Sequence, residues 1–310
     1  MAAALGERAH LALHLAALVL QQVDVAQAAH ALAEGDVVVV DERGGGLMSA
    51  AALVHDDYVT FCEGVRGLCN IDLLQYKRVQ MERRVRSFAQ RRGHALLAPY
   101  LVLLTGDAVA RDEFLDRVTI NVSNLWRNPE QWDRLQAEIV PALAAGGTLR
   151  AWSAGCSYGA EAYTLAAVCR LAAPAAATSI LGTDIDRRAI ERARAGDFSA
   201  EDVRDAPPAA LARFFAADGE RWRPAAELRA LVSFELGDLL RLRPPVSAYD
   251  LVLCRNTVIY FTEEVRDALH ERLASALRPG GVLIVGATER VTAPESIGLQ
   301  SMAPFTYRKA

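Results

Sequence analysis

The stretch WSAGCSYGAEAYTL, residues 152–165, decides the fold predicted for this chain. Its first residues close an apolar segment, a loop of small residues runs from Gly155 to Gly159, and a helical pattern follows. The next apolar segment, TSILGTDI (178–185), carries Asp184 near its end. This order of elements is typical of the first half of a Rossmann-type unit: a strand, a glycine loop, a helix, a second strand and then an acidic residue.

The alternation continues toward the C-terminus. Further strands are predicted from the apolar segments LVSFEL, YDLVLC and VLIVGA. The helical pattern EEVRDALHERLASAL and a turn, RPGG, precede the last of them. Apolar strands that alternate with helices favour an α/β fold, in which a mainly parallel sheet has helices on both faces. Residues 200–231 interrupt the pattern and predict a small appendage.

The region ahead of the α/β pattern is helical. Tyr58, Phe61 and Val65 recur at spacings of three and four residues, which predicts a helix face turned toward a core. We therefore expect a small all-helical domain before the α/β domain. Residues 1–47 end close to a glycine triplet, which predicts a flexible break. They are expected to form a leader that is either helical or poorly ordered.

Composition excludes several classes of protein. The 310 residues carry a formal net charge of −4, which argues against a general nucleic-acid binder. No apolar run approaches the roughly 18 residues that cross a bilayer, so no direct membrane insertion is expected. The five cysteines form no C-x-x-C pair, which favours reduced thiols and a cytoplasmic location. The six histidines show no metal-binding spacing, and we expect no metal.

The loop at 155–161, GCSYGAE, indicates a nucleoside ligand without a pyrophosphate. It lacks the full G-x-G-x-x-G pattern, which disfavours a nicotinamide dinucleotide and fits S-adenosylmethionine. Asp184 is placed to accept hydrogen bonds from both ribose hydroxyls, although it or Asp186 is expected to cap the next helix. Glu161 is predicted either to interact with the helix dipole or to bind the cationic amino group of the ligand.

Four segments together resemble one known family. WSAGCSYGAEAYTLA, TDID, CRNTVIYF and TINVSNLWRNP are similar to the CheR family of chemotaxis-receptor protein-glutamate O-methyltransferases. The resemblance runs from about Asp57 to Arg308 and implies a Rossmann-like class I methyltransferase domain behind a helical domain. The expected boundaries are a leader at 1–47, a helical domain at 48–118, a linker contributing to the cofactor site at 119–135, and a methyltransferase domain at 136–310 with its appendage near 205–237.

The resemblance also implies a set of site residues. The expected S-adenosylmethionine-binding positions are Asn121, Ser123, Arg127, Gly155, Glu161, Asp184, Asp238, Leu239, Arg255 and Asn256. Glu161 matches the carboxylate that holds the amino group of the cofactor, and Asp184 the one on its ribose. Tyr260 matches the tyrosine near the transferred methyl group. We expect Tyr260 and Arg127 to carry the catalysis, with S-adenosylhomocysteine as the product.

Three departures from the family pattern leave alternatives open. GAEAYT replaces the usual G-E-E-P-Y-S, Leu125–Trp126 replaces a double phenylalanine, and Asp238 stands where the family usually has asparagine. One alternative is a receptor-docking module that binds the cofactor without turnover. The other is a methyltransferase of the same fold that acts on another substrate.

The expected partner is the cytoplasmic helical part of methyl-accepting chemoreceptors. Residues 77–92 contain seven basic side chains and one acid, Glu82. Such a run is usually a solvated helix face, but here it forms a positive field in an acidic chain. The resemblance implies that this helix meets acidic methylation helices. We expect the chain to act as a monomer and to bind no nucleic acid.

Overall fold

The computed structural model describes residues 50–118 and 123–310, with side chains from Asp57 onward. The chain divides into two compact units, residues 1–114 and 115–310. The predicted leader at 1–47 and the predicted site residue Asn121 lie outside the described residues.

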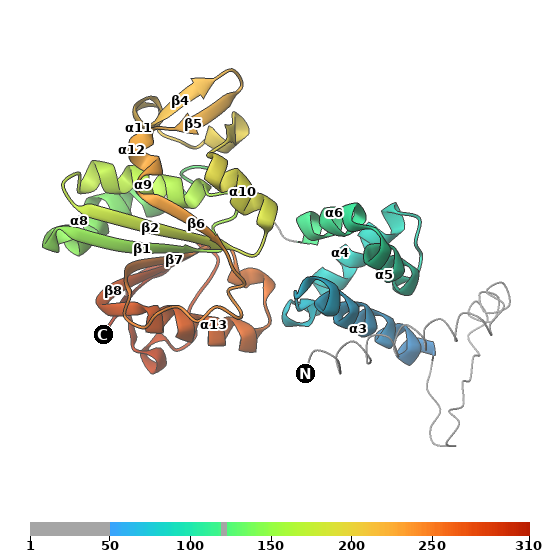
Figure 1. The fold of residues 1–310 in the computed structure, drawn as a ribbon. Helices are drawn as coiled ribbons and strands as arrows, with labels where there is room; N and C mark the ends of the chain where they lie inside the picture. The colour runs from blue at the N-terminus through green and yellow to red at the C-terminus, as the bar shows by residue number, and fades with distance from the viewer. Residues whose placement is uncertain (1–49, 119–122) are drawn as a thin grey trace. The chain divides into compact units, whose positions relative to one another are not determined.

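The N-terminal helices pack around a small aromatic core. They are α3 (Ala50–Cys69), α4 (Arg78–Arg91), α5 (Leu97–Gly106) and α6 (Ala108–Val118), with a 3-10 turn, η1, at Leu73–Gln75 (Figure 1). Tyr58, Phe61 and Val65 are all buried, as their spacing predicts. The ring of Phe61 stacks on that of Tyr100, with their centres 5.9 Å apart, and it meets the ring of Phe114 edge-on, with the centres 5.7 Å apart. Apolar contacts between side chains far apart in sequence therefore hold these helices together.

The C-terminal unit is built on a seven-stranded sheet. In spatial order its strands are β6 (Val232–Leu236), β2 (Ala177–Asp184), β1 (Thr148–Ala154), β7 (Tyr249–Cys254), β8 (Leu277–Val285), β10 (Thr306–Lys309) and β9 (Leu299–Ala303). Neighbours from β6 to β8 are parallel, while β10 runs antiparallel to both β8 and β9. The mainly parallel sheet confirms the predicted fold class.

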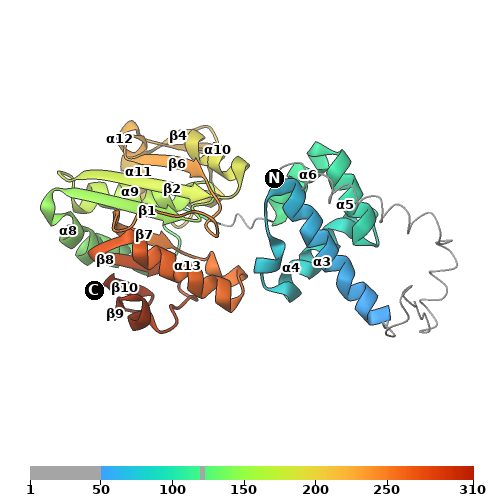
Figure 2. The ribbon, with the colours of Figure 1, turned by 60° about the horizontal axis from the view of Figure 1, so that its bottom comes forward.

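Helices cover both faces of this sheet. Figures 1 and 2 show α9 (Ala160–Ala172) along one face and α13 (Glu263–Ala276) along the other. Helix α10 (Arg187–Ala195) begins at Asp186, whose side chain accepts hydrogen bonds from the amides of Arg188 and Ala189, and it ends at Gly196 with φ of 64°. Asp186 is thus the capping residue, which leaves Asp184 available for another role.

The remaining elements are short. They are α7 (Pro129–Arg134), a π-helical turn η2 (Leu135–Ile139), α8 (Val140–Leu143), α11 (Pro208–Phe214), α12 (Ala226–Arg229) and the 3-10 turns η3 (Ala144–Gly146), η4 (Glu201–Val203), η5 (Val258–Tyr260) and η6 (Pro294–Ile297). Within the described residues, no helix has the length and apolar character needed to cross a bilayer.

The appendage is a separate three-stranded sheet. Its strands are β3 (Phe198–Ser199), β5 (Arg221–Pro224) and β4 (Phe215–Asp218), all antiparallel. It begins earlier than residue 205 and ends before residue 232, because β6 pairs with β2 in the main sheet. The RPGG segment (residues 278–281) falls within β8, but it has no partner in β7: Leu277 pairs with Tyr249 and Val282 with Leu251, and Gly280 between them has φ of 79°.

Candidate cofactor and methyl-transfer site

The sheet reverses its direction of winding between β1 and β7. The chain proceeds from β1 to β2 on one side, and it returns to place β7 on the other side of β1. In open α/β sheets ligands bind at such a switch point, outside the carboxyl ends of the strands. Gly155 directly follows β1, and Arg255 directly follows β7. The glycine loop and the CRNTVIYF segment therefore meet at the edge where the fold favours a ligand.

Gly155 brings the two loops into contact. Its φ is 80°, a conformation that favours glycine, and its amide donates a hydrogen bond to the carbonyl of Thr183 at 2.8 Å. A Cβ atom at this position would lie 2.6 Å from Oγ1 of Thr257. The loop after β1 thus packs against the CRNTVIYF segment after β7, and only glycine fits between them.

Asp184, at the end of β2, supports the glycine loop with its carboxylate. Oδ2 accepts the amide of Ser157 at 2.8 Å, and Oδ1 accepts the amide of Asp186 at 2.9 Å. Part of the residue is exposed, yet dense surrounding protein atoms raise the pKa of Asp184 to about 6, against the effect of its amide donors. Each carboxylate oxygen can accept a further hydrogen bond, so hydroxyl groups of a ligand can be bound here.

Glu161 pairs with Arg255 beneath the loops. Nη1 of Arg255 lies 3.3 Å from Oε2 of Glu161, and the hydroxyl of Ser153 donates to Oε1 at 2.7 Å. Burial raises the pKa of Glu161, and the nearby guanidinium opposes this shift. Sequence considerations gave the helix dipole and a ligand amine as the options for Glu161. In the structure the partner of Glu161 is Arg255, which follows the end of β7 and lies 94 residues later in the sequence.

The other donors of Arg255 fix the linker. Nε donates to Oε1 of Gln131 at 2.8 Å, and Nη2 donates to the carbonyl of Arg127 at 2.7 Å and to Oδ1 of Asn128 at 3.2 Å. The guanidinium also lies 5.1 Å from the centre of the Trp132 ring. Sequence reasoning did not identify Gln131 or Asn128; the NPEQ segment that follows Arg127 is the only local signal for them.

The linker is anchored in the methyltransferase unit on its other side as well. The amide of Leu125 donates to the carbonyl of Asp202 at 2.8 Å, and the amide of Trp126 donates to Oγ1 of Thr164 at 3.1 Å. Both side chains are buried, and the Trp126 ring meets Phe215 edge-on. The departure from the family's double phenylalanine is therefore a packed apolar pair. Ser123 is partly exposed at the start of this segment.

Asp202 connects the linker to two further segments. Its carboxylate accepts the hydroxyl of Tyr158 at 2.9 Å and the amide of Ser199 at 2.7 Å, and it also pairs with Arg192. Tyr158 belongs to the glycine loop and Ser199 to β3. These hydrogen bonds and the cation hold the pKa of Asp202 below its usual range, although burial acts in the opposite direction.

Asp238 and Leu239 follow β6, beside the end of β2. The amide of Gly237 donates to the carbonyl of Asp184 at 2.8 Å, which joins these two strand ends. Oδ1 of Asp238 accepts the amide of Leu240 at 2.9 Å, and Arg241 lies 3.4 Å from Oδ2. Leu239 is buried. The carboxylate at 238 thus has local partners that stabilise its charge.

The segment after β7 carries Asn256 and Tyr260. Asn256 has φ of 57°, and the turn η5 ends at Tyr260, which is half-buried. Both the amide of Asn256 and that of Ile259 donate to the carboxylate of Glu289, at 2.8 and 3.3 Å. Sequence reasoning missed Glu289. The signal available was an acidic residue just after the apolar strand VLIVGA, at the same edge of the sheet.

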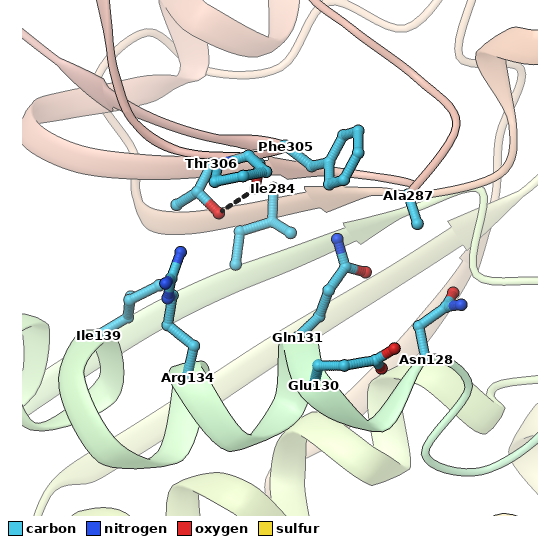
Figure 3. A pocket seen from close by; sticks show the side chains of 10 residues that line it. Asn128, Glu130, Gln131, Arg134, Ile139, Ile284, Ala287, Phe305 and Thr306 are labelled. Atoms are coloured by element: carbon cyan, nitrogen blue, oxygen red, sulfur yellow. Dashed lines mark hydrogen bonds between the residues drawn. The ribbon is translucent and has the colours of Figure 1, made fainter.

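A cavity of about 260 Å³ lies next to this region (Figure 3). It is formed by α7 on one side and by β8 and the chain around β10 on the other. Figure 3 shows Gln131 and Asn128, two of the partners of Arg255, at its wall. Its lining includes none of the predicted site residues that the structure describes, so it lies beside the candidate site.

Comparisons with known proteins match both parts of the chain to one family. Residues 121–304 match the model of the CheR methyltransferase SAM-binding domain, and residues 56–119 match that of the CheR all-alpha domain. This chain belongs to the CheR methyltransferase family. Its predicted cofactor, S-adenosylmethionine, is confirmed by the SAM-binding domain match, and it is a methyltransferase of the chemotaxis family.

Two relatives that this chain matches over nearly their whole length support the assignment. A chemotaxis protein methyltransferase from Listeria monocytogenes is 33% identical over 83% of this chain and 98% of that protein. Chemotaxis protein methyltransferase 1 from Pseudomonas aeruginosa is 30% identical over 78% and 92%. Among solved structures, an S-adenosylmethionine-dependent methyltransferase from Mesorhizobium loti is 24% identical over 47% of this chain and 51% of that chain, with a TM-score of 0.28.

Proposed function

We propose that this protein transfers a methyl group from S-adenosylmethionine to glutamate side chains of chemoreceptors in the cytoplasm. One observation supports this proposal most strongly: the family's motifs meet at one edge of the sheet. Gly155 contacts Thr257, and Arg255 joins Glu161 to the linker at Arg127. Segments far apart in sequence thus assemble one continuous rim around the switch point.

The described residues fit the proposed cofactor. Asp184 is a partly exposed carboxylate next to the glycine loop, suited to two ribose hydroxyls. Glu161 is already paired, but its oxygens can each accept another hydrogen bond, so an ammonium group of the ligand can join the pair. Asp238, Leu239 and Asn256 complete the rim on either side. When bound, S-adenosylmethionine supplies a methyl group on a sulfonium.

The chemistry demands alignment more than proton transfer. A glutamate side chain has a pKa of about 4.3, so the acceptor carboxylate is ionised at neutral pH and needs no general base. Tyr260 donates its hydroxyl to that carboxylate and orients it. Arg127 completes the pocket from the linker, where Arg255 holds its carbonyl. Correct alignment of reacting groups can lower a barrier by about 7–11 kcal/mol.

The receptor surface that we propose is on α4. Glu82 pairs with Arg78 and Arg86, and Arg86 also pairs with Asp57, so part of the positive charge of residues 77–92 is neutralised within the helices. Lys77, Arg83 and Arg91 are exposed. We assign these three side chains to contacts with acidic receptor helices.

The test is methyl transfer to receptors in their own membranes. The purified chain is incubated with methyl-labelled S-adenosylmethionine and membranes that contain chemoreceptors. Label on the receptor that mild base releases as methanol is expected, because γ-methyl esters are base-labile. A receptor in which the methyl-accepting glutamates are replaced by alanine is the control. Cofactor and receptor binding without label would instead favour a docking module, and label on a small molecule would favour another substrate.

A further inference from the structure

Glu289 is a nearly inaccessible carboxylate at the edge of the sheet where the site is built. It lies four residues beyond β8, and only 3% of its surface is exposed. Its Oε2 accepts the amides of Gly286 at 2.6 Å and of Asn256 at 2.8 Å, and its Oε1 accepts the amide of Ile259 at 3.3 Å. One side chain thus holds backbone groups of two separate loops.

The space around this carboxylate is made by a glycine. A Cβ atom on Gly286 would lie 2.6 Å from Oε2 of Glu289 and 2.7 Å from the amide nitrogen of Asn256. Contacts this short do not occur in real structures, so any larger residue would displace either the carboxylate or the loop. The arrangement therefore depends on the fit between Gly286, Glu289 and Asn256.

The charge of Glu289 is balanced by backbone amides. Burial raises the pKa of Glu289, and the amides of Gly286, Asn256, Ile259 and Val258 oppose that shift. Donors that are fixed in a loop and directed at a carboxylate stabilise its ionised form. The same bonds hold the loop at Asn256, which has a left-handed φ of 57°, a conformation that is uncommon for residues other than glycine and that asparagine adopts more readily than most.

We propose that Glu289 is a positioning residue, which fixes the turn from Asn256 to Tyr260 in the geometry that methyl transfer needs. The inference rests on the proposed function. Its amide contacts lie at both ends of the turn: Asn256 begins it, and Ile259 immediately precedes Tyr260. Glu289 acts through this turn and is not assigned a contact with cofactor or acceptor.

The experiment compares Glu289→Gln with Asp250→Asn as a matched control. Glutamine keeps the size of the side chain, but its NH2 group faces amide donors, so at least one bond is lost. Asp250 is also a buried carboxylate that accepts a backbone amide, that of Arg150, but it lies at the opposite end of β7. Asp250 also pairs with the half-exposed Arg278, and the loss of a buried carboxylate charge is common to both variants.

Two readouts are measured in the full chain. Hydrogen exchange of the amides of Asn256 and Ile259 should accelerate at least tenfold in Glu289→Gln and remain unchanged in Asp250→Asn. The kcat for receptor methylation should fall about tenfold or more in Glu289→Gln only, with a KM for S-adenosylmethionine that changes less. If Glu289→Gln does not fold, Gly286→Ala, which pushes on the same carboxylate, should give the same pattern.

The outcomes separate this inference from the proposed role of Tyr260. A wild-type kcat in Glu289→Gln overturns the inference, as does an equal loss of kcat in Asp250→Asn. A double variant of Glu289→Gln with Tyr260→Phe should lose little beyond the larger single loss, because both changes affect one unit. If Tyr260→Phe is fully active while Glu289→Gln is slow with faster exchange, the hydroxyl role fails and the positioning of the turn stands.

Discussion

Nη1 of Arg255 lies 3.3 Å from Oε2 of Glu161, and both side chains are almost completely buried. Removing one partner of a buried ion pair leaves an uncompensated charge, which typically costs about 3–5 kcal/mol. Arg255→Met should therefore lower the free energy of unfolding by that amount, measured by urea denaturation. The double variant with Glu161→Leu should recover much of the loss.

A control for this prediction is the pair of Arg134 and Glu138, which are 3.9 Å apart and largely exposed. Exposed pairs contribute about 1 kcal/mol or less. Arg134→Met should therefore change stability by no more than that. Equal effects of Arg134→Met and Arg255→Met would contradict the assignment of Arg255 as a buried, paired cation.

Asp184→Ala should weaken binding of S-adenosylmethionine by about 2–3 kcal/mol, because charge-assisted hydrogen bonds to the ribose are lost. Isothermal calorimetry measures this change. Asp186→Ala is the matched control: it removes the cap of α10 and should lower stability by about 1 kcal/mol while affinity is retained. Unchanged affinity in a folded Asp184→Ala variant would remove Asp184 from the site.

The raised pKa of Asp184, about 6, predicts a pH dependence. The ionised carboxylate is the better acceptor for hydroxyl groups, so affinity should be constant above about pH 6 and should fall as the pH decreases below it. For the stability of the free protein, the dependence on pH has the opposite sign. Between the ordinary pKa of 3.8 and about 6 the folded state binds more protons, so the contribution of Asp184 to stability decreases as pH rises through this window. A pH-independent affinity between pH 5 and 7 would contradict the role of Asp184.

Gly155→Ala should impair both folding and cofactor binding. The new Cβ would be strained at φ of 80° and would collide with Oγ1 of Thr257, and we expect a loss of about 1–3 kcal/mol in stability. Thr257→Ala should relieve part of this loss when the two are combined. Gly67→Ala is the control, because Gly67 lies within α3 with open space around it and alanine there should be neutral or stabilising. Stability is measured by thermal denaturation and affinity by cofactor titration, for Gly155→Ala, Thr257→Ala, their combination and Gly67→Ala.

Tyr260→Phe keeps the ring and removes only the hydroxyl. It should leave folding and cofactor affinity nearly unchanged and slow methyl transfer about ten- to a hundredfold, since each 1.4 kcal/mol corresponds to a factor of ten. Tyr249→Phe, at the opposite end of the same strand region, should transfer methyl groups at the wild-type rate. Equal rates for Tyr260→Phe and the wild type would show that the hydroxyl has no catalytic role.

Charge reversal on α4 tests the receptor surface. Arg83→Glu combined with Arg91→Glu should weaken association with receptor membranes while cofactor affinity stays the same. Arg243→Glu with Arg308→Glu changes the net charge equally at exposed positions elsewhere and should have little effect. Wild-type association should weaken as salt increases, since exposed charges are screened beyond about 8–10 Å at physiological ionic strength. Salt-insensitive binding would contradict an electrostatic contact.

The sequence predicts those features that depend on neighbouring residues. The alternation of apolar segments predicts the strands at β1, β2 and β7, and Asp186 is one of the two residues expected to cap α10. Hydrogen-bond partners that are far apart in the sequence cannot be predicted in this way. Glu289 accepts amides from residues 30 and 33 positions earlier, and a backbone amide carries no side-chain signal that a sequence can reveal. The RPGG segment is a local signal, and its residues interrupt the pairing of β8 with β7, which shifts register there.

The same reasoning applies to the basic helix. A count of charges predicts a strong positive field over residues 77–92, but that count ignores Asp57 from α3 and Glu113 from α6. Both carboxylates come close only when the helices pack, and they pair with Arg86 and Arg92. The charges that remain exposed are therefore fewer than the sequence suggests.

Asp202 ties the base of the small sheet to the linker and to the glycine loop through Leu125, Ser199 and Tyr158. The appendage is consequently not a detachable module. Its distal hairpin turns at Gly219, which has open surroundings, and can accept a tag, a fluorophore or an inserted peptide there. A deletion that starts at its base would instead release the linker from the cofactor rim, so the tip of the appendage tolerates changes that its base does not.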